Sequence, residues 1–245
     1  MTNIKITIEY NGTGYSGWQF QKEEKTIQGE LEKAIFKFSG EQMTIQGAGR
    51  TDAGVHALGQ CASFNLKKEF SEFQIMNGIN FHLGDEKIKI VKVEKVDDSF
   101  NARFTAKMKT YEYHILNRLA PCVLEDDFSL HIKQPLDIDL MSNAMKPLVG
   151  KHDFTSFRAK GCQAKSPVRS LDVTNLEKKN DKLILTFQAQ SFLYQQIRII
   201  TGSLIEIGLG KKNKDWINQL LLLKDRKFSG PTMPAKGLIL VSIDY

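Results

Sequence analysis

The stretch NIKITIEY, residues 3 to 10, alternates apolar and polar side chains, which is the pattern of a half-buried β-strand. After a loop comes Thr26, a residue type that caps helices, and the apolar positions behind it have the spacing of one helical face: Ile27, Leu31, Ile35 and Phe38. Downstream we predict strands near 42–48 and over 59–66, a helix that carries Phe70, Phe73, Met76 and Ile79, and a strand over 87–96. The first half of the chain therefore has the order β-α-β-β-α-β.

The second half follows the same order more loosely. It opens with TYEYHILN, a predicted strand over 110–117, followed by a helix near 139–149, strands over 168–177 and 182–190, helices over 191–208 and 213–223, and a last strand within GLILVSIDY, residues 237–245. Two units of this kind predict an α+β fold of two ferredoxin-like halves, whose antiparallel sheets meet at a central cleft. We expect an N-terminal half over 1–105 and a C-terminal half over 106–245.

The composition indicates a compact protein, because 41% hydrophobic and 25% charged residues, with only 6 prolines, argue against a disordered chain. No apolar run approaches the ~20 residues that cross a bilayer, and the N-terminus does not have the pattern of a signal peptide, so we expect a cytoplasmic protein. Neither the 3 scattered cysteines nor the 5 histidines have the spacing of metal ligands. The net charge of +6 favours a polyanionic partner.

The loop GTGYSG, residues 12–17, matches the glycine pattern of a dinucleotide-binding turn. That reading requires a helix directly after the loop, whereas WQFQKEEK intervenes before Thr26. A dinucleotide site is therefore disfavoured. The aromatic residues around this loop could stack on bases, and for Trp18 we expect packing in the core.

The stretch GAGRTDAGVH, residues 47–56, holds one carboxylate, Asp52, two residues after Arg50. It lacks the lysine of a phosphate-binding P-loop, and no second carboxylate is near enough in sequence to form an acid–base pair. Arg50 and Asp52 could form an ordinary surface ion pair. Alternatively, the glycines at 47, 49 and 54 would let a ligand approach the backbone, and an ionised Asp52 would suit a nucleophile or a general base.

Three further features are candidates for binding. Tyr111 and Tyr113 lie on one side of their predicted strand, where they would either pack or stack on a base. The segment 157–169 has no acidic residue and could be a solvated loop or a phosphate contact through Arg158, Lys160, Lys165 and Arg169. Arg198 stands within an otherwise apolar helix, and because an unpaired buried charge is costly, it should either pair with an acid or extend its charged end to solvent; we predict that Asp52 is its partner.

The block GAGRTDAGVHALGQ closely resembles the signature of the tRNA pseudouridine synthase A family. Further blocks of the family's kind follow in order over nearly the whole chain: YNGTGYSGWQFQ (10–21), FNARFTAKMKTYEYHI (100–115), HDFTSFR (152–158), SFLYQQIRIITGSLIEIGLGK (191–211) and PAKGLIL (234–240). The resemblance implies isomerisation of uridine to pseudouridine at positions 38–40 of the tRNA anticodon stem-loop. It also implies a homodimer that uses no metal and no organic cofactor.

The same resemblance assigns roles to residues of this chain. It implies that Asp52 is the catalytic aspartate, Tyr111 the tyrosine that stacks on the base, Arg198 the active-site arginine, and Leu238 an apolar contact of the target base. Arg50 would contact RNA or help to turn the base out. Whether Asp52 attacks C1′ or removes the C2′ proton stays open.

The chain departs from the family pattern before Arg198, where it has Tyr194, Gln195 and Gln196. A family member with a shifted RNA target is therefore kept as one alternative. A non-catalytic RNA-binding protein, which would need only a basic groove and aromatic residues, is the other. The intact GRTDAG loop favours an enzyme.

Overall fold

In the computed structural model, which describes all residues 1–245, the chain divides into two compact units. Unit 1 comprises Met1–Lys107 and Leu240–Tyr245, and unit 2 comprises Met108–Ile239. Both units combine helices with mainly antiparallel strands, as predicted for an α+β fold. No helix has both the length and the apolar character needed to cross a membrane.

Unit 1 has the predicted β-α-β-β-α-β order. Its elements are β1 (Thr2–Tyr10), α1 (Ile27–Ser39), β2 (Gln46–Gly47), β3 (His56–Leu66), α2 (Glu72–Leu83) and β4 (Ile88–Val96). The strand β1 lies between β4 and β3, β2 pairs with β3, and every pairing is antiparallel. This arrangement is that of a ferredoxin-like sheet.

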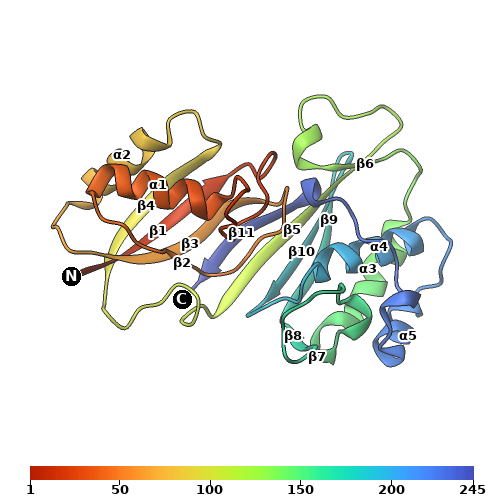
Figure 1. Cartoon of the computed structure of the whole chain (residues 1–245). Coiled ribbons are helices and arrows are strands. Elements are labelled where there is room, and N and C mark those ends of the chain that lie inside the picture. The colour runs from red at the N-terminus through yellow and green to blue at the C-terminus, as the bar shows by residue number, and fades with distance from the viewer. The chain divides into compact units, whose positions relative to one another are not determined.

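The helices α1 and α2 pack against each other over one face of the unit 1 sheet (Figure 1). The apolar positions of β1, Ile4, Ile6 and Ile8, are all buried on that face, as the predicted alternation requires. Gly78 in α2 allows the helices to approach, since a Cβ there would lie 2.1 Å from the Phe38 ring. On the other face of β1, Lys5 Nζ lies 4.8 Å from the centre of the Tyr245 ring.

Thr26 caps α1 as predicted, since its hydroxyl accepts a hydrogen bond from the Gly29 N–H at 3.2 Å. Of the residues predicted for the second helix, Ile79 is buried on α2 as expected, whereas Phe70 precedes the helix and Phe73 and Met76 are not buried. The buried residues of α2 are Ile75, Ile79 and Leu83, and Phe73 is 72% exposed. A spacing of three drifts around a helix, whereas the observed spacing of four keeps the side chains on one face.

Two predicted strand bounds in unit 1 also need correction. The strand expected near 42–48 is reduced to the two residues of β2, and β3 begins at His56 rather than at residue 59. The predicted strands over 3–10 and 87–96 are confirmed as β1 and β4, with changes of one residue at an end.

In unit 2, β10 pairs with β5 on one side and β9 on the other, both antiparallel, and β6 is parallel to β5. Its strands and helices are β5 (Met108–Asn117), β6 (Leu130–Ile132), α3 (Ile138–Met145), β7 (Gly150–Asp153), β8 (Val168–Leu171), β9 (Val173–Lys179), β10 (Lys182–Ala189), α4 (Gln196–Gly208) and α5 (Trp216–Leu223). The strand β11 (Leu238–Asp244) begins in unit 2 and ends in unit 1. Short 3-10 helices occupy 126–128, 146–148, 155–157, 226–228 and 235–237.

Several predictions for unit 2 are corrected. The strand predicted over 168–177 is broken at Asp172 into β8, which pairs with β7, and β9, which pairs with β10. The helix predicted over 191–208 begins only at Gln196, because Gln195 has a left-handed backbone with φ 58°. The sequence patterns did not indicate β6 or β7.

Candidate active site

The loop between β2 and β3 carries Asp52, and hydrogen bonds fix its backbone on both sides of that residue. The Tyr10 hydroxyl lies 2.8 Å from Thr51 Oγ1, and the Trp18 N–H donates to the Thr51 carbonyl at 3.1 Å. The Val55 N–H closes a turn by donating to the Asp52 carbonyl at 3.1 Å. Asp52 itself is half-buried, on a backbone that these hydrogen bonds fix.

The glycine loop at 12–17 supports the Asp52 loop directly. Gly17 has a φ of 88°, and a Cβ on it would lie 2.7 Å from the Thr51 carbonyl oxygen. A Cβ on Gly12 would lie 2.1 Å from the Val55 carbonyl oxygen, and the Gly12 N–H donates to His56 Nδ1 at 3.1 Å. These two glycines therefore let one loop lie against the other.

The glycines inside GAGRTDAG have separate structural roles. Gly47 faces the indole of Trp18, which is 2% exposed, and a Cβ there would lie 2.5 Å from that ring. Gly54 has a φ of 78°, which its turn requires. The close approach that we expected between a ligand and Gly47 is thus taken by Trp18, which packs in the core as predicted.

Burial shapes the chemistry beside Asp52. Tyr10 is 3% exposed, and burial raises the pKa of its hydroxyl to about 12, against the opposing effect of its hydrogen bond with Thr51. Tyr10 therefore stays a neutral hydrogen-bonding group at physiological pH. Arg50 is exposed, and its Nε–H donates to Gln19 Oε1 at 2.9 Å.

In unit 2, Tyr111 lies on β5 and is 8% exposed. Its ring meets that of Phe192 edge-on, with 5.3 Å between ring centres and 84° between ring planes. Tyr113, two residues along the strand, is fully buried and donates its hydroxyl to the Pro234 carbonyl at 2.8 Å. Of the two tyrosines, Tyr113 is fixed as a core residue, and Tyr111 keeps some exposure.

Arg198 lies in the first turns of α4 and is half-buried. Its Nε–H donates to the Met233 carbonyl at 2.7 Å, and the Met233 N–H donates back to the Arg198 carbonyl at 3.2 Å. The guanidinium is close enough to Tyr113 for its positive charge to oppose the rise in pKa that burial causes at that hydroxyl. These contacts fix the orientation of Arg198.

Leu238 begins β11 and is 7% exposed. The preceding Gly237 packs on the Tyr113 ring, where a Cβ would lie 2.7 Å from a ring carbon. Within unit 2, Tyr113 thus lies near Arg198 and against Gly237, the residue before Leu238.

The basic segment 157–169 contains two different kinds of cation. Arg158 donates to the carbonyls of Cys162 and Ala164 at 2.9 and 2.6 Å, and Arg169 donates to those of Ser166 and Val168 at 3.0 and 2.6 Å. Lys160 and Lys165 are exposed, and neither side chain forms a hydrogen bond or an ion pair. The arginines therefore shape the loop, and the lysines remain available to an anion.

The sequence patterns missed the residues that support these groups. Tyr10, Thr51 and Gly17 hold the Asp52 loop, and Phe192 packs on Tyr111. The glycines at 12–17 stood out in the sequence only as a disfavoured dinucleotide-binding pattern, and not as a support for Asp52. Nowhere do three or more histidine, cysteine, aspartate or glutamate side chains gather in a way that could hold a metal ion.

Comparison with known proteins matches both halves of the chain to one family. The family described as tRNA pseudouridine synthase matches residues 6–105 and 144–245. The chain is 47% identical to a tRNA pseudouridine synthase A of Wolbachia pipientis wMel and 46% identical to that of Ehrlichia canis, in both cases over 98% of this chain and 99% of the relative. It is 45% identical to that of Bartonella bacilliformis over the full length of both chains.

Proposed function

The chain belongs to the tRNA pseudouridine synthase family, and we propose that it isomerises uridine to pseudouridine at positions 38–40 of the tRNA anticodon stem-loop, with Asp52 as its single catalytic carboxylate. The reaction breaks the bond between C1′ and N1, turns the uracil, and forms a bond between C1′ and C5. The proton lost from C5 is balanced by one gained at N1. No water enters the product, so one ionised carboxylate is a sufficient covalent or basic group.

The observation that carries this proposal is the fixed backbone around Asp52. Hydrogen bonds to Thr51 and Asp52 hold the loop, and no other carboxylate belongs to it. Preorganisation of this kind lowers the cost of placing a reactive group against its target. Two first steps are compatible with the site. In one, a carboxylate oxygen bonds to C1′ as the C1′–N1 bond breaks; in the other, the carboxylate takes the C2′ proton as the same bond breaks, which gives a glycal. In both, uracil leaves with the electron pair of the broken bond.

The other residues have supporting roles in the proposed mechanism. Tyr111 stacks on the uracil and Leu238 packs against it, since a turned-out base is usually held by aromatic and apolar groups. Arg198 keeps Asp52 ionised and oriented, and Arg50 contacts the RNA. Lys160 and Lys165 bind phosphates, while Arg158 and Arg169 hold the shape of their loop.

The experiment is conversion of an unmodified tRNA transcript, with pseudouridine mapped by carbodiimide adducts and primer extension. We expect wild type to act within positions 38–40, and Asp52→Ala to lose activity while it still binds tRNA. Asp85→Ala, which removes an exposed carboxylate elsewhere in unit 1, is the matched control and should behave as wild type. Activity that survives in Asp52→Ala would overturn the proposed role of Asp52.

A transcript-wide pseudouridine map, with and without the protein, tests the position. Pseudouridine sites outside the anticodon stem-loop would indicate a shifted RNA target, the alternative suggested by the unusual residues Tyr194–Gln196. Binding without any conversion would instead indicate a non-catalytic RNA-binding protein. The excess of basic residues, 34 against 28 acidic ones, supports an RNA partner in either case.

We also propose that the protein is a homodimer that works in the cytoplasm, where tRNA is modified. The segment between β5 and β6 supports an interface, because Leu119 and Val123 are each 82% exposed and Leu124 is 95% exposed. Exposed apolar groups gathered in this way mark interaction surfaces. Light scattering should give twice the mass of 27.8 kDa, and a monomer at micromolar concentration would contradict the dimer.

A further inference from the structure

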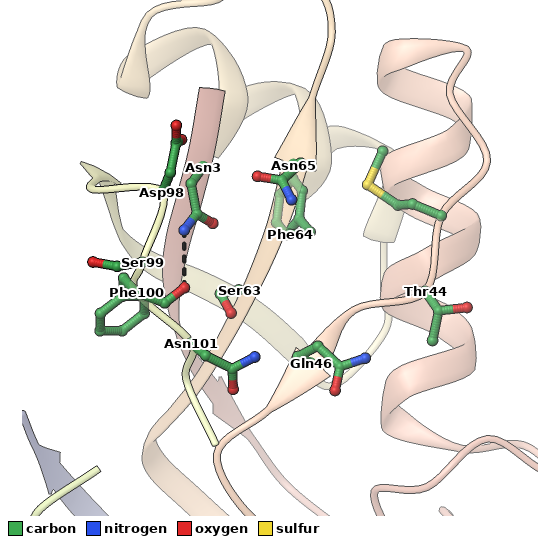
Figure 2. Close-up of a pocket in the computed structure, with 11 residues that line it drawn as sticks. Asn3, Thr44, Gln46, Ser63, Phe64, Asn65, Asp98, Ser99, Phe100 and Asn101 are labelled. Atoms are coloured by element: carbon green, nitrogen blue, oxygen red, sulfur yellow. Dashed lines mark hydrogen bonds between the residues drawn. The ribbon is translucent and has the colours of Figure 1, made fainter. Parts of the chain in front are cut away.

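A hollow of about 420 Å³ lies in unit 1, and none of its lining residues belongs to the Asp52 loop (Figure 2). Its volume falls in the range of sites for small ligands. The lining is mostly polar and contains no lysine or arginine: Asn3, Met43, Thr44, Gln46, Ser63, Phe64, Asn65, Asp98, Ser99, Phe100 and Asn101. Such a lining suits a neutral ligand with several hydrogen-bonding groups, and not a phosphate.

Asn3 presents a fixed acceptor to the hollow. It is 5% exposed, and its Nδ2 donates to the carbonyls of Asp97 and Phe100, both at 2.9 Å. These two bonds settle the orientation of the amide, so its oxygen is the atom left for a ligand. Figure 2 shows the nitrogen turned to Phe100 and the oxygen turned to the side of Ser63.

Asn101 and Ser63 present fixed donors. The Oδ1 of Asn101 accepts from the N–H groups of Arg103 and Phe104 at 2.9 and 3.2 Å, which leaves its NH₂ group for other partners. The oxygen of Ser63 accepts from the Ala102 N–H at 3.1 Å, and its hydroxyl proton can still be donated. The wall therefore holds one acceptor and two donors whose positions the fold determines.

Two further amides flank this fixed wall. Gln46 on β2 is paired with Ser63 on β3, and Asn65 lies two residues further along β3. The side chains of Gln46 and Asn65 are exposed, and neither forms a hydrogen bond within the chain. Figure 2 shows Asn65 at the upper end of the hollow and Gln46 and Asn101 at the lower end. A planar ligand bound between these amides would form hydrogen bonds with them along its edge.

We propose that this hollow binds an unstacked nucleobase of the RNA substrate through its hydrogen-bonding edge, an inference that rests on the proposed function. Asparagine and glutamine amides pair with base edges through one donor and one acceptor. The half-buried ring of Phe100 adds an apolar wall, which suits the plane of a base. The carboxylate of Asp98 would repel a phosphate at the same place.

The first experiment titrates isotope-labelled protein with each of the four nucleosides, which carry no phosphate, and follows side-chain amide signals by NMR. We expect saturable shifts of the Asn65 and Asn101 NH₂ signals with at least one nucleoside, and no such shifts with ribose 5-phosphate. The double variant Gln46→Ala, Asn65→Ala should lose the response. No shift with any nucleoside, or an equal shift with ribose 5-phosphate, would overturn the proposal.

The second experiment measures tRNA affinity against salt concentration. The same double variant should bind tRNA about tenfold more weakly, because a base contact of this kind carries discrimination of that order. The slope of log affinity against log salt should not change, since no phosphate contact is lost. Gln219→Ala, an exposed amide in unit 2, is the control and should match wild type.

Unchanged affinity in the double variant, or a loss accompanied by a shallower salt slope, would also overturn the proposal. The proposed function fails by a different result, which is activity in Asp52→Ala. The nucleoside titration does not depend on catalysis, so the two failures are distinguishable.

Discussion

The Tyr10 hydroxyl lies 2.8 Å from Thr51 Oγ1, in a buried contact between the end of β1 and the residue before Asp52. This bond joins the sheet of unit 1 to the loop that carries the proposed catalytic carboxylate. Because a buried hydroxyl without a partner is costly, the bond affects both stability and the position of the loop.

Removal of this bond should destabilise the protein. Tyr10→Phe leaves Thr51 Oγ1 without its partner, and we expect the free energy of unfolding to fall by about 1–2 kcal/mol. Urea denaturation measures the loss. Thr51→Val removes the other half of the pair, and the double variant should lose less than the sum of the single losses. Fully additive losses would mean that the two hydroxyls do not interact.

Stability at alkaline pH should depend on the same hydroxyl. Burial raises the pKa of Tyr10 to about 12 in the folded chain, compared with about 10 when unfolded. The stability that the neutral hydroxyl contributes is therefore fully present below about pH 10 and is lost as the pH rises towards 12. At pH 11 the loss in the free energy of unfolding is about 1.4 kcal/mol. When the pH is raised from 8 to 11, the free energy of unfolding should therefore fall by about 1.4 kcal/mol less in Tyr10→Phe than in wild type. Tyr194→Phe, at a 44% exposed site, is the control and should follow wild type.

The approach of the glycine loop to the Asp52 loop gives a matched pair of variants. Gly17 and Gly14 have similar φ values, 88° and 85°, so alanine brings similar backbone strain at each. Only at Gly17 does a Cβ meet the Asp52 loop, whereas nothing lies within 4 Å at Gly14. Gly17→Ala should therefore lower kcat at least tenfold beyond any effect of Gly14→Ala. Equal kcat values would show that the contact does not position Asp52.

Gly17 differs from Gly14 in a contact with a distant part of the chain, and such contacts are what the sequence alone does not reveal. The strands β1 and β4 and the cap at Thr26 depend on local alternation and local hydrogen bonds, and they were predicted with small errors. Gly17 and Gly47 depend on residues that lie more than 25 positions away, so no local pattern reveals their partners. The late start of α4 was not predictable either. Glutamine usually continues a helix, whereas Gln195 has a left-handed backbone here.

The contact between Tyr111 and Phe192 should affect turnover. An edge-on aromatic pair contributes about 0.5–1.5 kcal/mol, and it restricts how the Tyr111 ring can turn. Phe192→Leu should lower kcat/KM about fivefold to tenfold on tRNA, while Phe192→Tyr, which keeps the ring, should retain most of it. Single-turnover conversion of tRNA measures both. Equal losses in the two variants would contradict a role for the ring contact.

The partner of Asp52 is the last prediction, and Arg50 and Arg198 are the two candidates. Arg50 is exposed and donates its Nε–H to Gln19 at 2.9 Å, and exposed ion pairs contribute less than about 1 kcal/mol. Arg198 is half-buried, and its Nε–H is fixed by the Met233 carbonyl at 2.7 Å, so loss of a partner there is more costly. Two double-mutant cycles on the free energy of unfolding decide between them, one with Asp52→Asn and Arg198→Met, the other with Asp52→Asn and Arg50→Met. We expect a coupling energy of about 1 kcal/mol or more for Arg198 and less than about 0.5 kcal/mol for Arg50. A larger coupling energy with Arg50 than with Arg198 would show that Arg50 is the partner of Asp52, and that Arg198 is a structural residue of unit 2.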